Sequence, residues 1–74
     1  MPTSLDVKGL NCPLPVLRIK KKIRDVAPGD VLTVEATDPG VVADAEAFCA
    51  AGGHALLASR EAAGVITLEI RRGG

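Results

Sequence analysis

The residues best suited to chemistry form the segment Cys12-Pro13-Leu14-Pro15, which precedes a long helical pattern. Proline suits the first turn of a helix, where its missing N–H would have had no partner, and it disfavours helical geometry in the residue before it. Cys12 is therefore expected at or near the N-cap. The positive end of the helix, with Lys8 and Arg18 nearby, is expected to stabilise the thiolate and lower the pKa of Cys12. Because the thiolate is the nucleophilic form, Cys12 is the candidate for sulfur chemistry.

A structural interpretation of Cys12 stays open, since free cysteines are often small buried hydrophobes.

Cys49 falls on the apolar stripe of a second predicted helix, and we expect it to be a buried, inert thiol. No disulfide between the two is expected in a reducing compartment. Two cysteines and one histidine cannot supply a four-ligand zinc site within one chain, so no metal site is expected.

Length and composition indicate one domain over residues 1–74, near the lower size limit for a self-sufficient core. Hydrophobic residues make up 47% of the chain and aromatic residues 1%, so Val, Leu, Ile and Ala must build the core. The net charge of zero predicts no global attraction to nucleic acid or membrane. Because neither a signal peptide nor a run of transmembrane length is visible, we expect a cytoplasmic protein.

Apolar periodicity predicts the element order β-α-β-α-β-β. The strands are expected at residues 4–8, 31–36, 54–59 and 65–71, with a hairpin loop at 60–64, and the helices at 13–26 and 39–51. The first strand-helix-strand unit predicts parallel pairing with a right-handed crossover. The expected fold is an α/β two-layer sandwich, with a four-stranded mixed sheet and both helices on one face.

The apolar positions that should form the core follow the period of each element. They are Val16, Ile19, Ile23 and Val26 in the first helix, Val41, Val42, Ala45, Phe48 and Cys49 in the second, and Leu32, Val34, Ala36, Ile66, Leu68 and Ile70 in the strands. Asp38 is predicted to be the N-cap of the second helix, with Pro39 at its first position. This cap accounts for Asp38 without a bound metal or phosphate.

The first predicted helix carries five of the nine basic residues of the chain: Arg18, Lys20, Lys21, Lys22 and Arg24. This basic face is either the solvated side of an amphipathic helix or a surface that binds an acidic partner, with Arg18, Lys21 and Lys22 as candidates. Leu14 and Leu17 lie outside the apolar stripe. They either pack on a neighbouring element or form an apolar docking patch beside Cys12.

His54 is a candidate general base for Cys12, because histidine titrates near neutral pH. It follows a glycine pair at the start of a strand, and nothing in the sequence indicates that it reaches Cys12. A structural or surface role is therefore favoured.

Several segments together carry a family resemblance that extends from Leu5 to Gly74. They are Leu5-Asp6-Val7-Lys8-Gly9-Leu10-Asn11-Cys12-Pro13-Leu14-Pro15, Lys20-Lys21-Lys22, Pro28-Gly29-Asp30, Asp38-Pro39-Gly40, Gly53-His54 and Ile70-Arg71-Arg72-Gly73-Gly74. With these segments the chain resembles the TusA, or SirA-like, family of small sulfur-carrier proteins. The resemblance implies that Cys12 accepts sulfane sulfur as a persulfide, supported by Gly9, Pro13 and Pro15 of the motif.

The resemblance also implies partners. The sulfur would come from a cysteine desulfurase or a rhodanese-like donor and pass to a downstream relay protein, with no metal and no organic cofactor. Family relays of this kind serve tRNA 2-thiouridine synthesis, sulfur supply for molybdenum cofactor, or dissimilatory sulfur oxidation. Leu14 stands where some members carry an acidic residue, so the pathway is left open. A monomer suits such a carrier.

Two other functions compete with the carrier. In the first, the basic helix binds RNA or an acidic regulator and Cys12 is incidental. The absence of Tyr and Trp argues against a base-stacking surface, and zero net charge argues against strong phosphate binding. In the second, the Gly73-Gly74 tail carries a thiocarboxylate, as in ubiquitin-like sulfur carriers. Those carriers begin with a β-hairpin and this chain does not, so the tail is interpreted as a frayed end.

Overall fold

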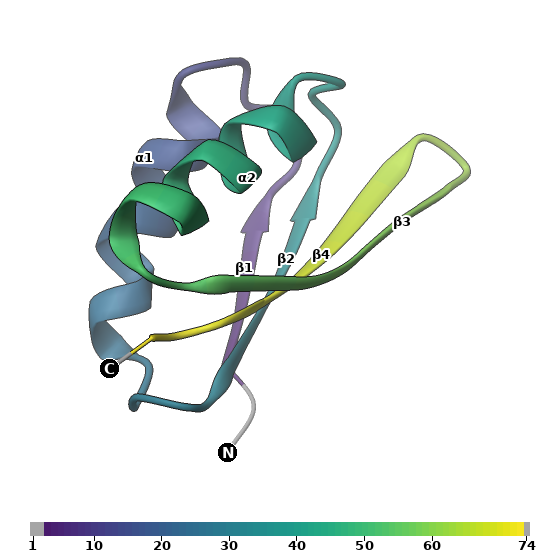
Figure 1. Ribbon diagram of the computed structural model, residues 1–74. Helices are drawn as coiled ribbons and strands as arrows, with labels where there is room; N and C mark the ends of the chain where they lie inside the picture. The colour runs from purple at the N-terminus through teal and green to yellow at the C-terminus, as the bar shows by residue number, and fades with distance from the viewer. Residues whose placement is uncertain (1–2, 74) are drawn as a thin grey trace.

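The computed structural model describes residues 3–73, which form two layers (Figure 1). One layer is a mixed sheet with the strand order β1-β2-β4-β3, and both helices cover the same face of it. β1 (Thr3–Val7) pairs in parallel with β2 (Val31–Ala36), whereas β4 (Val65–Arg71) pairs antiparallel with β2 and with β3 (Ala55–Ala62). The predicted sandwich is confirmed. The parallel pair results from the crossover helix between β1 and β2, which returns the chain to the starting edge.

The core lies between the helices and the two central strands, β2 and β4. Their alternating apolar residues face each other across the pairing register, with Leu32 opposite Ile70 and Val34 opposite Leu68. All four of these side chains are fully buried. Burying one such side chain stabilises the fold by roughly 1.5–3 kcal/mol. The inward faces predicted from the period-two pattern are therefore confirmed.

The first helix is shorter than predicted. α1 runs over Leu14–Lys22 and is followed by a 3₁₀ turn, η1, over Ile23–Asp25, whereas one helix was predicted over 13–26. Val26 is already extended, with φ −93° and ψ 131°. The chain must turn here into Ala27-Pro28, and the residue before a proline avoids helical geometry. The tighter last turn still buries Ile23 and Val26, so the predicted stripe keeps its packing role.

The second helix, α2, runs over Val41–Gly52, and Gly40 occupies its N-cap. The prediction that Asp38 is the N-cap is wrong. The Asp38 carbonyl accepts the N–H of Val41, and its side-chain Oδ1 accepts the N–H of Gly40 at 3.4 Å. At the other end Gly53 adopts φ 73°, the left-handed conformation that glycine tolerates best, and ends the helix as the glycine pair predicted.

The β3–β4 hairpin is tighter than the predicted loop over 60–64. β3 continues to Ala62, and only Ala63 and Gly64 lie between the strands, with φ of 53° and 80°. Two consecutive residues with positive φ are typical of the two-residue turn that matches strand twist. The far end of this hairpin extends beyond the helices (Figure 1).

The Gly73-Gly74 tail was predicted to be frayed, and this prediction is wrong for Gly73, which is anchored together with the preceding Arg72. The Arg72 guanidinium donates to the carbonyls of Arg24 and Val26, and the N–H of Gly73 donates to Nδ1 of His54 at 2.9 Å. Gly74, the last residue of the predicted tail, lies outside the described residues.

Within residues 3–73, no helix has the length and apolarity needed to cross a membrane.

Candidate functional site

Cys12 lies where the loops after β1 and β2 meet. These strands are parallel neighbours, so their carboxyl ends lie at the same edge of the sheet (Figure 1). Two hydrogen bonds join the loops. The N–H of Gly9 donates to Oγ1 of Thr37 at 2.9 Å, and the N–H of Cys12 donates to Oδ2 of Asp38 at 3.0 Å. The loop after β2 therefore helps to position Cys12.

The motif residues around Cys12 shape its loop. Gly9 has φ 82°, a conformation that favours glycine, and it starts the turn toward Cys12. Pro13 occupies the N-cap of α1 and Pro15 is buried in its first turn. Cys12 therefore precedes the N-cap by one residue, and a cis peptide bond joins it to Pro13.

The thiol of Cys12 is oriented toward α2. Its Sγ donates to Oδ2 of Asp44 at 3.1 Å, and Asp44 lies in the first turn of α2. Cys12 is exposed, and Asp44 is half-buried. A protein partner can therefore reach the sulfur and the carboxylate together.

This contact reverses the expected acidity of the thiol. The pKa of Cys12 is raised, first by its hydrogen bond to Asp44, then by desolvation, and then by the negative charges of Asp44 and Asp38. The prediction of a lowered pKa is therefore wrong. The physical reason is that the sulfur faces two carboxylates across the fold, while Lys8 pairs with Asp6 at 3.9 Å.

Asp44 was missed by the sequence analysis, which followed only the apolar stripe of the second helix. A signal was present in the chain. Asp44 is an acidic residue in the first turn of the helix that follows β2, and that turn must lie at the same sheet edge as the loop after β1. Asp38 was singled out, but its side chain bonds to Cys12 as well as to its own loop.

One donor atom each from Cys12, Asp38 and Asp44 lie within 4.8 Å of one another, and no ion is present among them. Hydrogen bonds within the chain account for this grouping. Asp38 accepts the N–H groups of Cys12 and Gly40, and Asp44 accepts the thiol proton. We assign no metal to these residues.

Comparisons with known proteins show which family the chain belongs to. The family model described as sulfurtransferase TusA matches residues 3–72. The chain belongs to this family. It is 54% identical over 68 residues to the Neisseria meningitidis serogroup A protein NMA0882, with 92% of each chain covered.

Two further relatives are named sulfur carrier protein TusA. The Pseudomonas aeruginosa protein is 47% identical over 68 residues, which cover 92% of this chain and 86% of the relative. The Allochromatium vinosum protein is also 47% identical over 68 residues, with 92% and 90% covered. The match to the family model includes the Cys12 loop and α2, so the site lies within the part of the chain that the TusA family shares.

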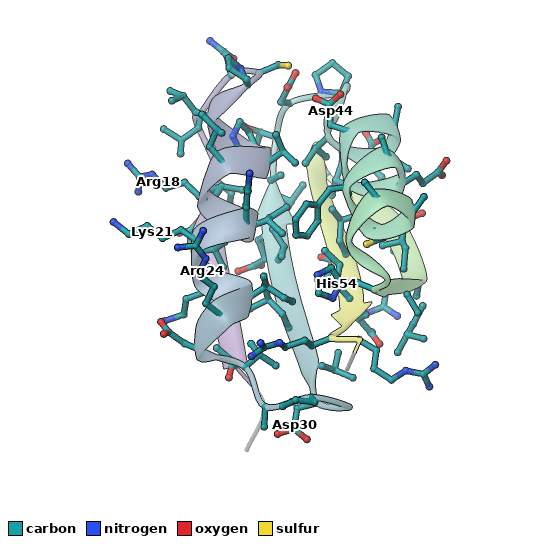
Figure 2. The ribbon with its side chains drawn as sticks, turned by 60° about the vertical axis from the view of Figure 1, so that its left-hand side comes forward. Arg18, Lys21, Arg24, Asp30, Asp44 and His54 are labelled. Carbon is teal, nitrogen blue, oxygen red and sulfur yellow. The ribbon has the colours of Figure 1, made fainter. Side chains whose placement is uncertain are left out.

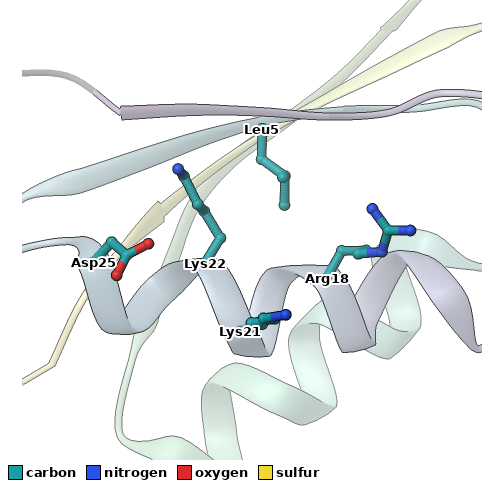
Figure 3. Close-up of a pocket in the computed structure, with 5 residues that line it drawn as sticks. All are labelled: Leu5, Arg18, Lys21, Lys22 and Asp25. Carbon is teal, nitrogen blue, oxygen red and sulfur yellow. The ribbon is translucent and has the colours of Figure 1, made fainter.

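The predicted partner-binding residues of this TusA-family chain all lie on α1. Leu14 and Leu17 are 45% and 52% exposed, and neither is among the residues packed against the core. Figure 2 shows Arg18 and Lys21 pointing away from the body of the protein. Arg18, Lys21 and Lys22 line a groove of about 470 Å³ between α1 and β1, together with Leu5 and Asp25 (Figure 3).

His54 does not join the Cys12 site. It follows the C-terminal end of α2, whereas Asp44 lies in the first turn, and the helix rises roughly 12 Å from Asp44 to its last residue, Gly52 (Figure 2). Its ring stacks on Phe48, with centroids 5.2 Å apart, and its Nδ1 accepts the N–H of Gly73. His54 therefore has the structural role that the sequence favoured.

Cys49 is buried in α2, as predicted for a core thiol.

Proposed function

We propose that this member of the TusA family is a sulfur carrier that accepts sulfane sulfur on Cys12 and passes it to an acceptor protein. The observation that carries the proposal is the exposure of Cys12 at the start of its Cys-Pro-Leu-Pro motif, just before α1. A carrier must present its sulfur to two successive proteins, and a thiol in the core would serve neither. Names of the relatives support the same role.

The chemistry is thiol exchange. The Cys12 thiolate attacks the outer sulfur of a donor persulfide, the sulfur–sulfur bond of the donor breaks, and the donor leaves as a thiolate. A thiolate of the acceptor then attacks the outer sulfur held on Cys12, the sulfur–sulfur bond to Cys12 breaks, and Cys12 leaves as a thiolate. These steps use the residues of the two proteins, and the proposal includes no metal and no organic cofactor. Gly9, Pro13 and Pro15 act by holding the loop that presents Cys12.

The proposed partners are a cysteine desulfurase or rhodanese-like donor and a downstream relay protein. Leu14 and Leu17 offer exposed apolar area on α1, next in sequence to the motif, and Arg18, Lys21 and Lys22 offer positive charge further along. An acidic partner face would be steered to this helix by charge complementarity. We place the carrier in the cytoplasm as a monomer, where thiols stay reduced. The relayed sulfur would serve tRNA thiolation, sulfur supply for molybdenum cofactor, or sulfur oxidation.

The test is intact-protein mass spectrometry after incubation with a cysteine desulfurase and cysteine, without reductant. We expect one added sulfur, mapped to the peptide that contains Cys12 and removed by dithiothreitol. Cys12→Ser should abolish the addition, whereas Cys49→Ser is the matched control and should keep it. If no sulfur is added from this donor, the same assay is repeated with thiosulfate and a rhodanese-like protein. A chain that takes sulfur from neither donor would contradict the proposal and favour a binding role for α1.

A further inference from the structure

The carboxylate of Asp44 holds the proton of the Cys12 thiol, through the 3.1 Å contact between Oδ2 and Sγ. Asp44 lies in the first turn of α2, where the positive end of the helix stabilises a negative charge. The negative charge of its carboxylate favours a neutral sulfur and opposes a second negative charge beside it.

The charges that act on the sulfur are those of two carboxylates. Asp44 comes from α2, and Asp38 comes from the loop before it; both raise the pKa of Cys12. The nearby cations serve other contacts. Lys8 lies 3.9 Å from the Asp6 carboxylate, and Arg18 lines the groove between α1 and β1. The free carrier thus holds Cys12 as a thiol, although the proposed transfer needs a thiolate.

We propose that Asp44 makes the reactivity of Cys12 depend on a cationic group of the partner, a lysine or arginine side chain of the sulfur donor or acceptor. A partner ammonium or guanidinium that pairs with Asp44 removes the proton acceptor and offsets its charge. The thiol proton then passes to water and the thiolate forms. This inference rests on the proposed function, because it concerns how the carrier recognises its partners.

Bonds and protons balance in the exchange step when a partner cation pairs with Asp44. The Cys12 thiolate forms a bond to the outer sulfur of the donor persulfide, the donor sulfur–sulfur bond breaks, and the departing donor thiolate takes one proton from water. This proton replaces the one that Cys12 released, so no external oxidant or reductant is needed. In unloading, Cys12 is the leaving group, and a less basic thiolate leaves faster. A cation at Asp44 therefore speeds both transfers, whereas the isolated carrier retains its sulfur.

The first experiment measures how fast iodoacetamide alkylates Cys12 as a function of pH, by mass spectrometry of the peptide that contains it. Asp44→Asn and Asp44→Ser both remove the charge, and both should move the profile to lower pH and speed alkylation at pH 7.5. Glu46→Gln is the matched control, because it removes the same charge from an exposed position of α2. Its profile should match that of the unmodified chain. Unshifted profiles in both Asp44 variants would overturn the proposal.

The second experiment uses two small disulfides of similar size, the cationic cystamine and the neutral 2-hydroxyethyl disulfide. The rate ratio for mixed-disulfide formation on Cys12 measures the preference for a cation. We expect this ratio to be about fivefold higher in the unmodified chain and in Glu46→Gln than in Asp44→Asn, the size of one close charge pair in water. An equal ratio in all three proteins would overturn the proposal.

Neither experiment requires sulfur from an enzyme, so the two proposals fail separately. A chain that shows both shifts and takes no sulfur from a desulfurase or a rhodanese-like donor supports the coupling through Asp44 and overturns the carrier function. A chain that takes up sulfur on Cys12 and shows neither shift keeps the carrier function and overturns the coupling.

Discussion

The Oδ2 atom of Asp38 accepts a 3.0 Å hydrogen bond from the backbone N–H of Cys12. The loop after β2 thereby holds the loop that carries the sulfur. We expect Asp38→Ala to lower the free energy of unfolding by about 1 kcal/mol, the net value of one hydrogen bond. The Cys12 amide should exchange with solvent faster, which NMR measures directly. Glu46→Ala, also on the surface, is the control. An unchanged exchange rate in Asp38→Ala would show that other contacts hold the loop.

Leu68 is fully buried at the centre of β4, opposite Val34. We expect Leu68→Ala to lower the free energy of unfolding by about 2–5 kcal/mol, because it removes buried methyl groups and leaves a cavity. That loss is a large fraction of the total stability of a small domain. Leu57→Ala, at a position that is 47% exposed, should change it little. Urea unfolding compares the two, and equal losses would contradict this description of the core.

Gly73 leaves no room for a larger residue, because a Cβ atom there would overlap the carbonyl oxygen of Gly53. Gly73→Ala should displace the tail from His54 and lower the free energy of unfolding by about 1–3 kcal/mol, the usual cost of overpacking. Thermal unfolding measures this effect.

Sulfur loading on Cys12 should stay unchanged in Gly73→Ala, since the tail and the loops after β1 and β2 lie at opposite ends of the molecule (Figure 1). Deletion of residues 73–74 should also leave transfer intact. If the deletion abolished transfer, a carrier with a C-terminal thiocarboxylate would be favoured instead.

Cys49 should make the fold sensitive to alkaline pH. Burial raises the pKa of its thiol, so the folded chain keeps this proton at pH values where the unfolded chain has lost it. The stabilisation is complete below the unfolded pKa of about 8.5 and is lost as pH rises through the higher folded pKa. Urea unfolding between about pH 8 and 10, under reducing conditions, should therefore show a steeper decline than in Cys49→Ala. Cys12 is present in both proteins, so it does not affect the difference. Parallel curves would contradict the prediction.

Lys21 lies in the basic groove between α1 and β1. If an acidic partner face docks there, Lys21→Glu should slow persulfide loading from the donor several-fold at low ionic strength, and the difference should shrink as salt screens the charges. Arg71→Glu is the matched control, because it makes the same charge change at an exposed position of β4. Stopped reactions analysed by mass spectrometry give the rates. Equal slowing by both variants would indicate a general charge effect and contradict docking at α1.

Local pattern was enough to predict much of this fold. Leu32, Val34 and Ala36 alternate along β2 and are all buried, because a strand places successive side chains on opposite faces. Ile19, Ile23 and Val26 kept their common face even though the helix tightens after Lys22. The hairpin turn was harder to place, since Arg60 and Glu61 can stand in a loop or on an edge strand, and pairing with β4 decides between them.

The sequence by itself singled out Cys12 as the candidate for sulfur chemistry, because the cysteine, its two prolines and the basic helix are neighbours along the chain. Only the tertiary structure determined the direction in which the pKa of its thiol is shifted. Asp44 is 32 residues away in sequence and reaches Sγ because parallel pairing of β1 and β2 brings the loop of Cys12 to the start of α2. The pKa of a thiol responds to charges a few ångströms away in space, whichever part of the chain supplies them, and here they are carboxylates.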